Sequence, residues 1–205
     1  GALLHLLVQI PSVLRSGYKY KLVMSLSLPG VRKIGKLMLP RAFGLGVTQI
    51  NQVVITTIAS TLVVGSVAVF NLANNLQYFP ISVFGVSLAL SAFPIFTQAF
   101  TENDTSKFVL HFSQTFRRIL FLVIPTSIVI LLLRAQIVRL VLGAGNFDWE
   151  DTILTAQTLG FFSLSLFAQS LIPMLARSFY AFQNTKTPVI ISVISMAINI
   201  IGSII

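Results

Sequence analysis

Long apolar stretches separated by short polar connections dominate this chain. Residues 42–101 contain no Lys, Arg, Asp or Glu, and residues 152–176 and 187–205 are also free of charge. An apolar run of about 18 residues or more is typical of a transmembrane helix. The two-residue alternation that marks a membrane β-barrel is absent. We therefore predict an all-α integral membrane protein, a polytopic bundle of transmembrane helices.

The uncharged segment 42–101 is too long for a single crossing. At about 1.5 Å per residue it would form roughly 90 Å of helix, whereas the hydrocarbon core of a bilayer is about 30 Å thick. We therefore place a turn near Gly65 and Ser66. The predicted spans, about six in all, are 1–14, 42–65, 67–100, 113–133, 152–175 and 187–205. The chain begins with Gly and ends within an apolar run, so we expect a piece of a longer membrane protein.

Charge predicts how these spans are oriented. Only 9% of the residues are charged, against roughly 25% in a soluble domain, and the net charge is +9. The basic excess falls on the first, third and fifth connections, as it does on cytoplasmic loops. We predict that these three connections are cytoplasmic and that Arg41, Arg177 and Lys186 meet lipid headgroups there. Because these residues flank apolar spans without any zinc-finger or helix-turn-helix pattern, we predict no nucleic-acid partner.

Polar residues inside the second and third spans are the strongest candidates for a site. Those of the second span are spaced by three, four and four, which puts them on one helical face: Gln49, Gln52, Thr56 and Ser60. The same arithmetic predicts one shared face in the third span: Asn71, Asn74, Asn75, Tyr78, Ser82, Gly85, Ala89 and Ala92. Either helix packing or a water-filled cavity accounts for such stripes on physical grounds. Packing explains the Gly and Ala positions better than the Asn positions, since an amide facing lipid is costly.

Three further positions in the third span have separate interpretations. Gln77 lies off the stripe, so it can face a neighbouring helix instead. Pro80 removes one backbone hydrogen bond and can bend the helix. We assign Pro80 and Gly85 to a hinge or kink, of the kind that is common where a transporter builds a central site.

Catalytic chemistry is poorly represented. His5 and His111 are the only histidines, there is no Cys, and no phosphate loop, zinc-binding HExxH or catalytic-triad pattern is present. His111 lies in the amphipathic run "SKFVLHFSQTFRRILF", which favours a helix lying on the cytoplasmic interface. The acids of "NFDWEDT" occupy one short loop, and we interpret Asp151 as an N-cap or first-turn acid of the next helix. The sequence thus predicts neither an enzyme nor a metal site.

Several segments resemble a known family. These are "MLPRAFGLGVTQIN", "ANNLQYFPISVFGVSLALSAFP", "GNFDWEDT" and "RSFYAFQNTKTPV", which occur in order and at matching spacings. They are similar to the MurJ (MviN) lipid II flippases of the multidrug/oligosaccharidyl-lipid/polysaccharide exporter superfamily. The resemblance implies a protein of about fourteen helices in two lobes. Residues 1–41 would end the first lobe and supply a basic cytoplasmic connection, and residues 42–205 would begin the second lobe.

The resemblance also implies a function. Such proteins move the undecaprenyl-pyrophosphate-linked peptidoglycan precursor across the bacterial cytoplasmic membrane by alternating access. Membrane lipids and cell-wall synthesis proteins are the other partners implied. The family's matching helices line a hydrophilic cavity, which favours the cavity interpretation for Gln49, Gln52, Thr56, Asn71, Asn74, Asn75 and Tyr78. No cofactor is expected, and coupling to an ion or to the membrane potential is left open.

Two positions depart from the family pattern. Members often carry an Arg at the place of Asn75 for the pyrophosphate, and an Asp near Ile55 for a bound cation. Asn75 can donate hydrogen bonds but brings no charge, and Ile55 cannot bind a cation. An exporter of another lipid-linked oligosaccharide or of a small drug therefore stays as the alternative function. A membrane-embedded enzyme of polyprenyl metabolism would need acidic clusters at the membrane surface, and the cytoplasmic connections offer only Glu102 and Asp104.

Overall fold

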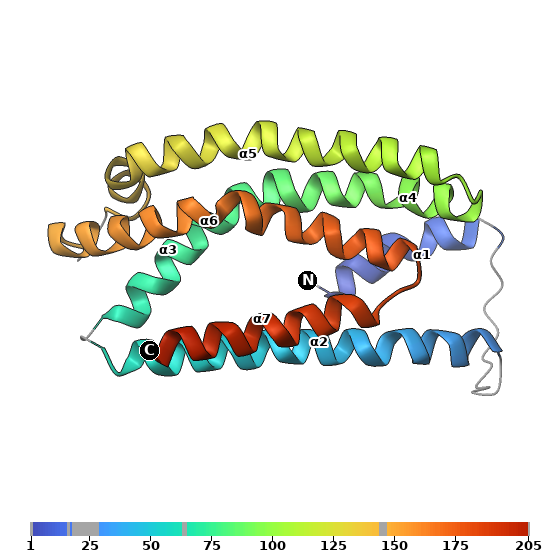
Figure 1. The fold of residues 1–205 in the computed structure, drawn as a ribbon, viewed down its shortest axis with the longest axis horizontal. Helices are drawn as coiled ribbons and strands as arrows, with labels where there is room; N and C mark the ends of the chain where they lie inside the picture. The colour runs from blue at the N-terminus through green and yellow to red at the C-terminus, as the bar shows by residue number, and fades with distance from the viewer. Residues whose placement is uncertain (1, 16, 18–28, 63–64, 144–146, 205) are drawn as a thin grey trace. The chain divides into compact units, whose positions relative to one another are not determined.

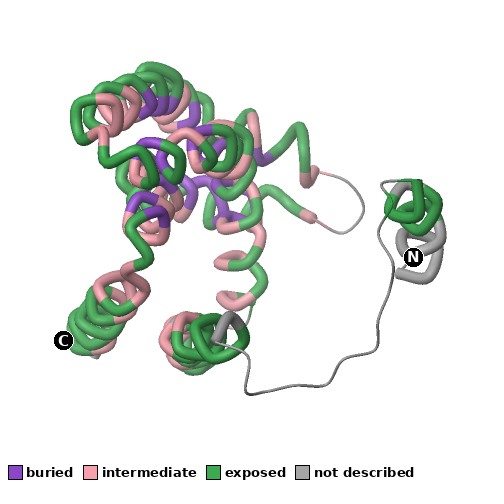
Figure 2. Tube along the Cα trace, turned by 90° about the vertical axis from the view of Figure 1, so that its right-hand side faces the viewer, coloured by how far each residue is buried: buried purple, intermediate pink, exposed green. Residues whose placement is uncertain are grey.

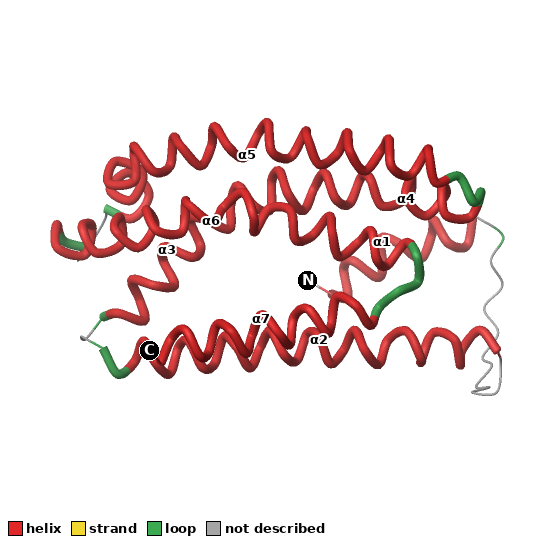
Figure 3. Tube along the Cα trace, in the orientation of Figure 1, coloured by secondary structure: helices red, strands yellow, loops and turns green. Residues whose placement is uncertain are grey.

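The described chain is helical throughout, as predicted. The structure is a computed structural model that describes residues 2–15, 17, 29–62, 65–143 and 147–204. These residues form helices joined by short turns, and no strand occurs among them (Figure 3). The chain divides into two compact units, residues 1–36 and 37–205.

The first unit holds α1 (Ala2–Arg15) and the first residues of α2 (Pro29–Ser60), which continues into the second unit. α1 has 14 described residues, fewer than the roughly 18 that a transmembrane helix needs. The first predicted span, residues 1–14, therefore stays a prediction. Residues 18–28 of the first basic connection lie outside the described residues, and residues 29–41 belong to α2, which begins earlier than the predicted span 42–65.

The second unit contains the remaining helices. α3 (Ser66–Pro80), the π-helical turn η1 (Ile81–Val86) and α4 (Ser87–Thr101) follow one another without a break, and α5 (Thr105–Leu142), α6 (Trp149–Ala181) and α7 (Lys186–Ile204) complete it. Five helical stretches among the described residues are long and apolar enough to cross a membrane, beginning at residues 31, 66, 105, 149 and 186. The predicted division of segment 42–101 is confirmed, because Gly65 separates α2 from α3 in a left-handed conformation with φ 97°.

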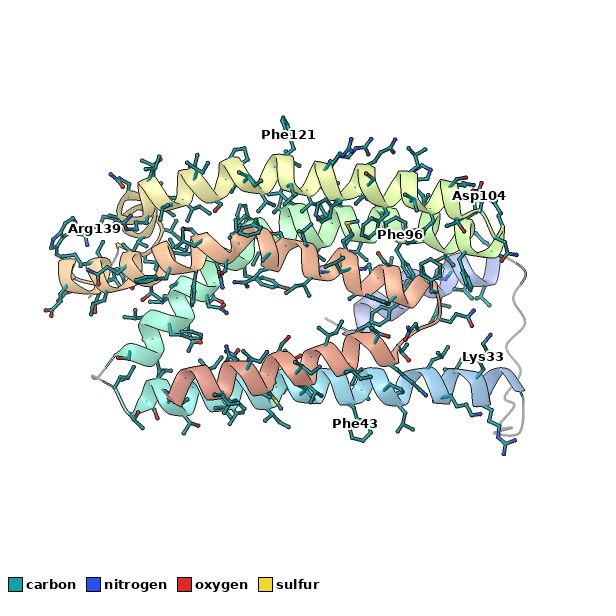
Figure 4. All side chains as sticks on the ribbon, in the orientation of Figure 1. Lys33, Phe43, Phe96, Asp104, Phe121 and Arg139 are labelled. Carbon is teal, nitrogen blue, oxygen red and sulfur yellow. The ribbon has the colours of Figure 1, made fainter. Side chains whose placement is uncertain are left out.

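The core lies where α4, α5 and α6 pack side by side (Figure 1). Phe96, Ile119 and Leu166 come from these three helices and are fully buried. The buried positions gather at the meeting of these helices in Figure 2. Figure 4 shows the contrast between Phe96, which lies within this group, and Phe121, which points away from it. Phe121 is 78% exposed, as expected for a side chain that faces lipid.

The start of α5 corrects one prediction. Residues 106–121 do not form a separate helix on the membrane interface, because α5 runs helically from Thr105 to a local break at Leu133 (φ −102°, ψ 18°). The physical reason is aromatic packing. The rings of Phe108 and Phe112 lie 5.3 and 6.3 Å from the ring of Phe96 on α4, so this apolar face is used within the protein.

Local signals fix the helix ends. At the start of α6, Asp148 Oδ1 accepts from the backbone N–H of Asp151, and the Asp148 N–H donates to Asp151 Oδ2, at 2.9 and 3.2 Å. This is a capping box with Asp148 as the cap, so the assignment of Asp151 to the first turn is confirmed. Two residues after each of α4 and α6 ends, a non-glycine residue has φ 55°, Asn103 and Gln183 respectively.

Candidate functional site

The predicted polar face is exposed along α3. Asn71, Asn75 and Tyr78 are exposed, with Tyr78 at 58%, while Asn74 is half-buried. α3 runs obliquely from the turn after α2 toward the group formed by α4, α5 and α6 (Figure 1). Other described residues therefore leave these three polar side chains largely uncovered along the first half of this span.

The continuous stretch of α3, η1 and α4 presents a different helical face to its neighbours after η1. Its buried positions repeat every four residues through this region: Ala73, Gln77, Ile81, Gly85 and Ala89. A π-helical turn contains an extra residue, and one inserted residue rotates all that follows by about 100°. Gly85 and Ala89 are thus on the buried face, whereas Asn71 and Asn75 are on the exposed face. The prediction of one shared face from Asn71 to Ala92 is wrong because the period of 3.6 fails across η1.

Pro80 flanks this irregular turn, and Gly85 lies within it. Pro80 directly precedes η1 and has no backbone N–H, so the regular hydrogen-bond ladder is interrupted there. A Cβ added to Gly85 would lie 2.5 Å from the carbonyl oxygen of Ser170 and 3.0 Å from its Cα. Glycine therefore allows α6 to approach closely at this point. The role of Pro80 and Gly85 as a hinge or kink stays a prediction.

A chain of side-chain hydrogen bonds connects α3 to α6. Gln77 is only 4% exposed, and its Nε2 donates to Asn74 Oδ1 at 3.0 Å. Gln169 Nε2 donates to Gln77 Oε1 at 3.4 Å and to Ser165 Oγ at 2.8 Å. The expectation that Gln77 faces a neighbouring helix is confirmed. The structure thereby links Asn74, a predicted cavity residue, to two residues of α6.

Sequence reasoning did not single out Ser165 and Gln169. Their spacing of four on an apolar span places both on one helical face, and this was an available signal. The sequence could not supply their partner, since Gln77 and Gln169 lie 92 positions apart.

The polar residues of α2 lie apart from this chain of hydrogen bonds. Gln49 and Gln52 are exposed, and Thr56 is half-buried. The Thr56 hydroxyl donates to the carbonyl oxygen of Gln52 at 2.8 Å, so it is satisfied within its own helix. Among the described residues, no side-chain hydrogen bond joins Gln49, Gln52 or Thr56 to the Asn residues of α3. A cavity lined jointly by the two polar faces therefore stays a prediction.

Two of the predicted headgroup residues lie near the connection between α6 and α7, Arg177 in the last turns of α6 and Lys186 at the start of α7. Arg177 is half-buried and donates to the carbonyl oxygen of Pro173 at 3.3 Å, and the exposed Lys186 begins α7. The side chains of Arg41 and His5 lie outside the described residues.

A cavity of about 390 Å³ lies between α2, α6 and α7. Its lining is mainly apolar and includes Gly44, Phe179 and Val189. None of the predicted cavity residues lines it, so it is distinct from the polar face of α3.

Comparisons with known proteins agree over the whole chain. The family model described as "Lipid II flippase MurJ" matches residues 1–205. The chain is 34% identical to a probable lipid II flippase MurJ of Haemophilus influenzae, over 97% of this chain and 40% of that protein. It is 30% identical to a probable lipid II flippase MurJ of Vibrio cholerae, over 98% of this chain and 38% of that protein.

A solved structure supports the same relationship. It is titled "Lipid II flippase MurJ, inward closed conformation" and matches with a TM-score of 0.73 and 27% sequence identity, over 97% of this chain and 41% of that one. The chain thus spans about two fifths of the length of the relatives that it matches over nearly its full length.

Proposed function

The chain belongs to the lipid II flippase MurJ family, and we propose that it forms part of a transporter that moves lipid II across the bacterial cytoplasmic membrane. The observation that carries this proposal is the exposed polar face of α3, formed by Asn71, Asn75 and Tyr78 on a helix long and apolar enough to cross a membrane. The membrane location follows from the family and from the five apolar helices. The cargo is the lipid-linked peptidoglycan precursor, and membrane lipids surround the protein.

The physical argument concerns where these amides can lie. Hydrocarbon offers no hydrogen-bond partner, so amides at membrane depth need either another helix or a hydrated space. A hydrated space suits a cargo whose head carries pyrophosphate, sugar and peptide groups, all of which accept hydrogen bonds. Gln49, Gln52 and Thr56 of α2 would line the same space in the complete protein. Alternating access would then expose this space to each side of the membrane in turn.

The remaining assignments follow from the same transport role. Movement of a lipid changes no covalent bond, so no catalytic residue or cofactor is required. Residues 42–205 would form the first part of the second lobe, and Arg177 and Lys186 would meet anionic headgroups on the cytoplasmic side. Ile55 cannot bind a coupling cation, so any coupling to an ion or to the membrane potential would use other residues. Cell-wall synthesis proteins are the partners that such a precursor would meet next.

One observation favours the second candidate function, export of a different lipid-linked oligosaccharide or of a small drug. Asn75 brings no charge to a position where the resemblance leads one to expect Arg. A less anionic cargo would need fewer cations on the cavity wall. Depletion of the complete protein distinguishes the two functions, because each predicts that a different lipid accumulates.

The test is conditional depletion of the full-length protein in cells without a second flippase. We expect lipid II to accumulate in the inner leaflet and wall synthesis to stop, and the unaltered gene to restore both. Asn75→Arg should also restore growth, because a hydrated wall keeps a guanidinium solvated, whereas Asn75→Leu should restore it poorly at equal protein level. Normal lipid II export in depleted cells would contradict the proposal, and accumulation of another lipid-linked sugar would establish the second candidate.

A further inference from the structure

We propose that Asn74 presents its two amide N–H groups to acceptor oxygens on the cargo head, and that Ser165, Gln169 and Gln77 fix this orientation. This inference rests on the proposed function and assigns a new role to a set of hydrogen bonds between α3 and α6. An asparagine side chain that can rotate offers either its oxygen or its nitrogen. The contacts around Asn74 allow only one of the two.

Ser165 determines which group donates and which accepts in each of these hydrogen bonds. A serine hydroxyl has one hydrogen and two lone pairs. Ser165 Oγ donates its hydrogen to the carbonyl oxygen of Phe162 at 3.0 Å, back along its own helix. Toward Gln169 it can therefore only accept, and it does so from Gln169 Nε2 at 2.8 Å. Gln169 must then present its nitrogen on this side.

The same direction passes to Gln77 and Asn74. Gln169 Nε2 donates its second hydrogen to Gln77 Oε1 at 3.4 Å, which leaves Gln77 Nε2 to donate to a residue of its own helix, α3. That nitrogen donates to Asn74 Oδ1 at 3.0 Å. With its oxygen engaged, Asn74 keeps Nδ2 and two hydrogens for other partners. Each side chain in the series thus donates in one direction only.

The unused nitrogen of Asn74 can be reached. Gln77 is almost fully buried, but Asn74 is half-buried and lies one helical turn from the exposed Asn71. Among the described residues, Asn74 Nδ2 donates no hydrogen bond, and this atom is not among their buried unpaired polar atoms. A pair of fixed N–H donors suits a group that only accepts, such as a phosphate or carboxylate oxygen. A freely rotating amide would also present its oxygen, which repels an anion, whereas the fixed Asn74 presents only N–H groups.

Binding of lipids to the full-length protein in nanodiscs tests the inference. Lipid II and undecaprenyl pyrophosphate serve as ligands, because the second carries the pyrophosphate without sugar or peptide. Asn74→Asp keeps the oxygen that accepts from Gln77 but removes both donors, so we expect the Kd to rise about tenfold or more. A rise for both lipids places the phosphate on Asn74, and a rise for lipid II alone places the sugar or peptide there. Binding of both lipids at the unaltered Kd would overturn the proposal.

A double-mutant cycle tests the positioning residues. Gln77→Met removes the donor that holds Asn74, so we expect the Kd to rise about threefold, since only part of the population keeps the competent orientation. In an Asn74→Ala background the same change should have no further effect. Gln157→Met replaces an exposed glutamine of α6 outside the set and should leave the Kd unchanged.

The outcomes separate positioning from general packing. If Gln77 served packing alone, Gln77→Met would raise the Kd equally in both backgrounds, and that result would overturn the positioning role. Melting temperatures of all variants show whether each protein is folded, and Asn74→Ala replaces Asn74→Asp if the latter is unfolded. An unaltered protein that binds neither lipid would overturn the proposed function together with this inference. An unaltered protein that binds, with unaffected variants, would overturn this inference alone.

Discussion

Two parts of the second unit are similarly apolar but packed very differently. In α3–α4 and in α6, the most apolar stretches have mean hydropathies of 1.9 and 1.6, and a third of each is buried. In α2 and α7 the values are 1.3 and 1.5, yet only 6% and 0% of these stretches are buried. Apolar character places a helix in the membrane, but it does not determine which helices pack together. Lipid is as apolar as leucine, so small and polar residues decide helix association.

The side chains of the two parts show this rule. α6 carries Thr155, Ser163 and Ser170 at full burial, and Ser127 of α5 donates to the carbonyl oxygen of Ser163. In α2 the described hydroxyls bond within their own helix, as Thr56 does. At Gly46 an added Cβ would have nothing within 4 Å among the described residues, unlike at Gly85. α2 and α7 therefore keep surface for lipid or for helices of a longer protein.

The largest expected difference between the two parts concerns phenylalanine. Phe96 is fully buried among α4, α5 and α6, whereas Phe43 of α2 is 66% exposed (Figure 4). Phe96→Ala should lower the free energy of unfolding by about 3 kcal/mol, because it leaves a cavity. Phe43→Ala should change it by less than about 0.5 kcal/mol. Thermal unfolding of the full-length protein in detergent measures both, and equal losses would mean that the packed group is not the stable part.

Glycine gives a second contrast of intermediate size. Gly85→Ala places a Cβ against backbone atoms of Ser170, which cannot move aside as a flexible side chain can. We expect a loss of about 1–3 kcal/mol from overpacking. Gly46→Ala has free space and should be neutral or should stabilise α2 by up to about 1 kcal/mol through helix propensity. The same unfolding assay applies, and a tolerated Gly85→Ala would show that α3–α4 and α6 can separate at low cost.

The spans were predictable because charge and length act locally. Residues 42–101 hold no charge and exceed one bilayer thickness, so two helices with a break at Gly65 were required. The cap at the start of α6 was readable for the same reason, since Asp148 and Asp151 lie three residues apart. Each of these features depends on neighbours along the chain.

The site was less predictable because it depends on contacts far apart in sequence. The π-helical turn after Pro80 shifts the helical phase, and no pattern of 3.6 residues can reveal such a shift. Gln77 was expected to meet another helix, but Gln169 could not be named as its partner. The Phe residues of α5 matched an interfacial helix equally well until Phe96 was placed beside them. Whether Asn71, Asn75 and Tyr78 line a cavity stays a prediction.

The smallest expected effect lies in the turn that closes the packed group between α4 and α5. Lys107 Nζ lies 2.7 Å from Glu102 Oε2, and Gln98 Nε2 donates to Glu102 Oε1 at 2.8 Å. The hydrogen bond from Lys107, with a second from Gln98, lowers the pKa of the Glu102 carboxyl. The hydroxyl of Ser106 and the backbone N–H of Lys107 likewise lower the pKa of Asp104. Glu102 and Asp104 lie in the turn between the two candidate membrane spans, and Glu102 is 45% exposed.

The lowered pKa values set the sign of a pH effect. A carboxyl whose pKa is lower in the folded state stabilises that state above its unfolded pKa, and this contribution disappears as the pH falls through the lowered value. The stability is therefore expected to fall with pH below about pH 4.5.

Lys107→Met removes the largest cause of the lowered pKa of Glu102, so unfolding by acid should begin at slightly higher pH than in the unaltered protein. Because the Lys107–Glu102 pair is exposed, Lys107→Met should lower the free energy of unfolding much less than Phe96→Ala does. Acid titration of the full-length protein at low salt measures this shift, with Lys33→Met on exposed α2 as the control. A shift as large for Lys33→Met would attribute the acid response to net charge, and no shift for Lys107→Met would show that buried contacts alone hold α4 against α5.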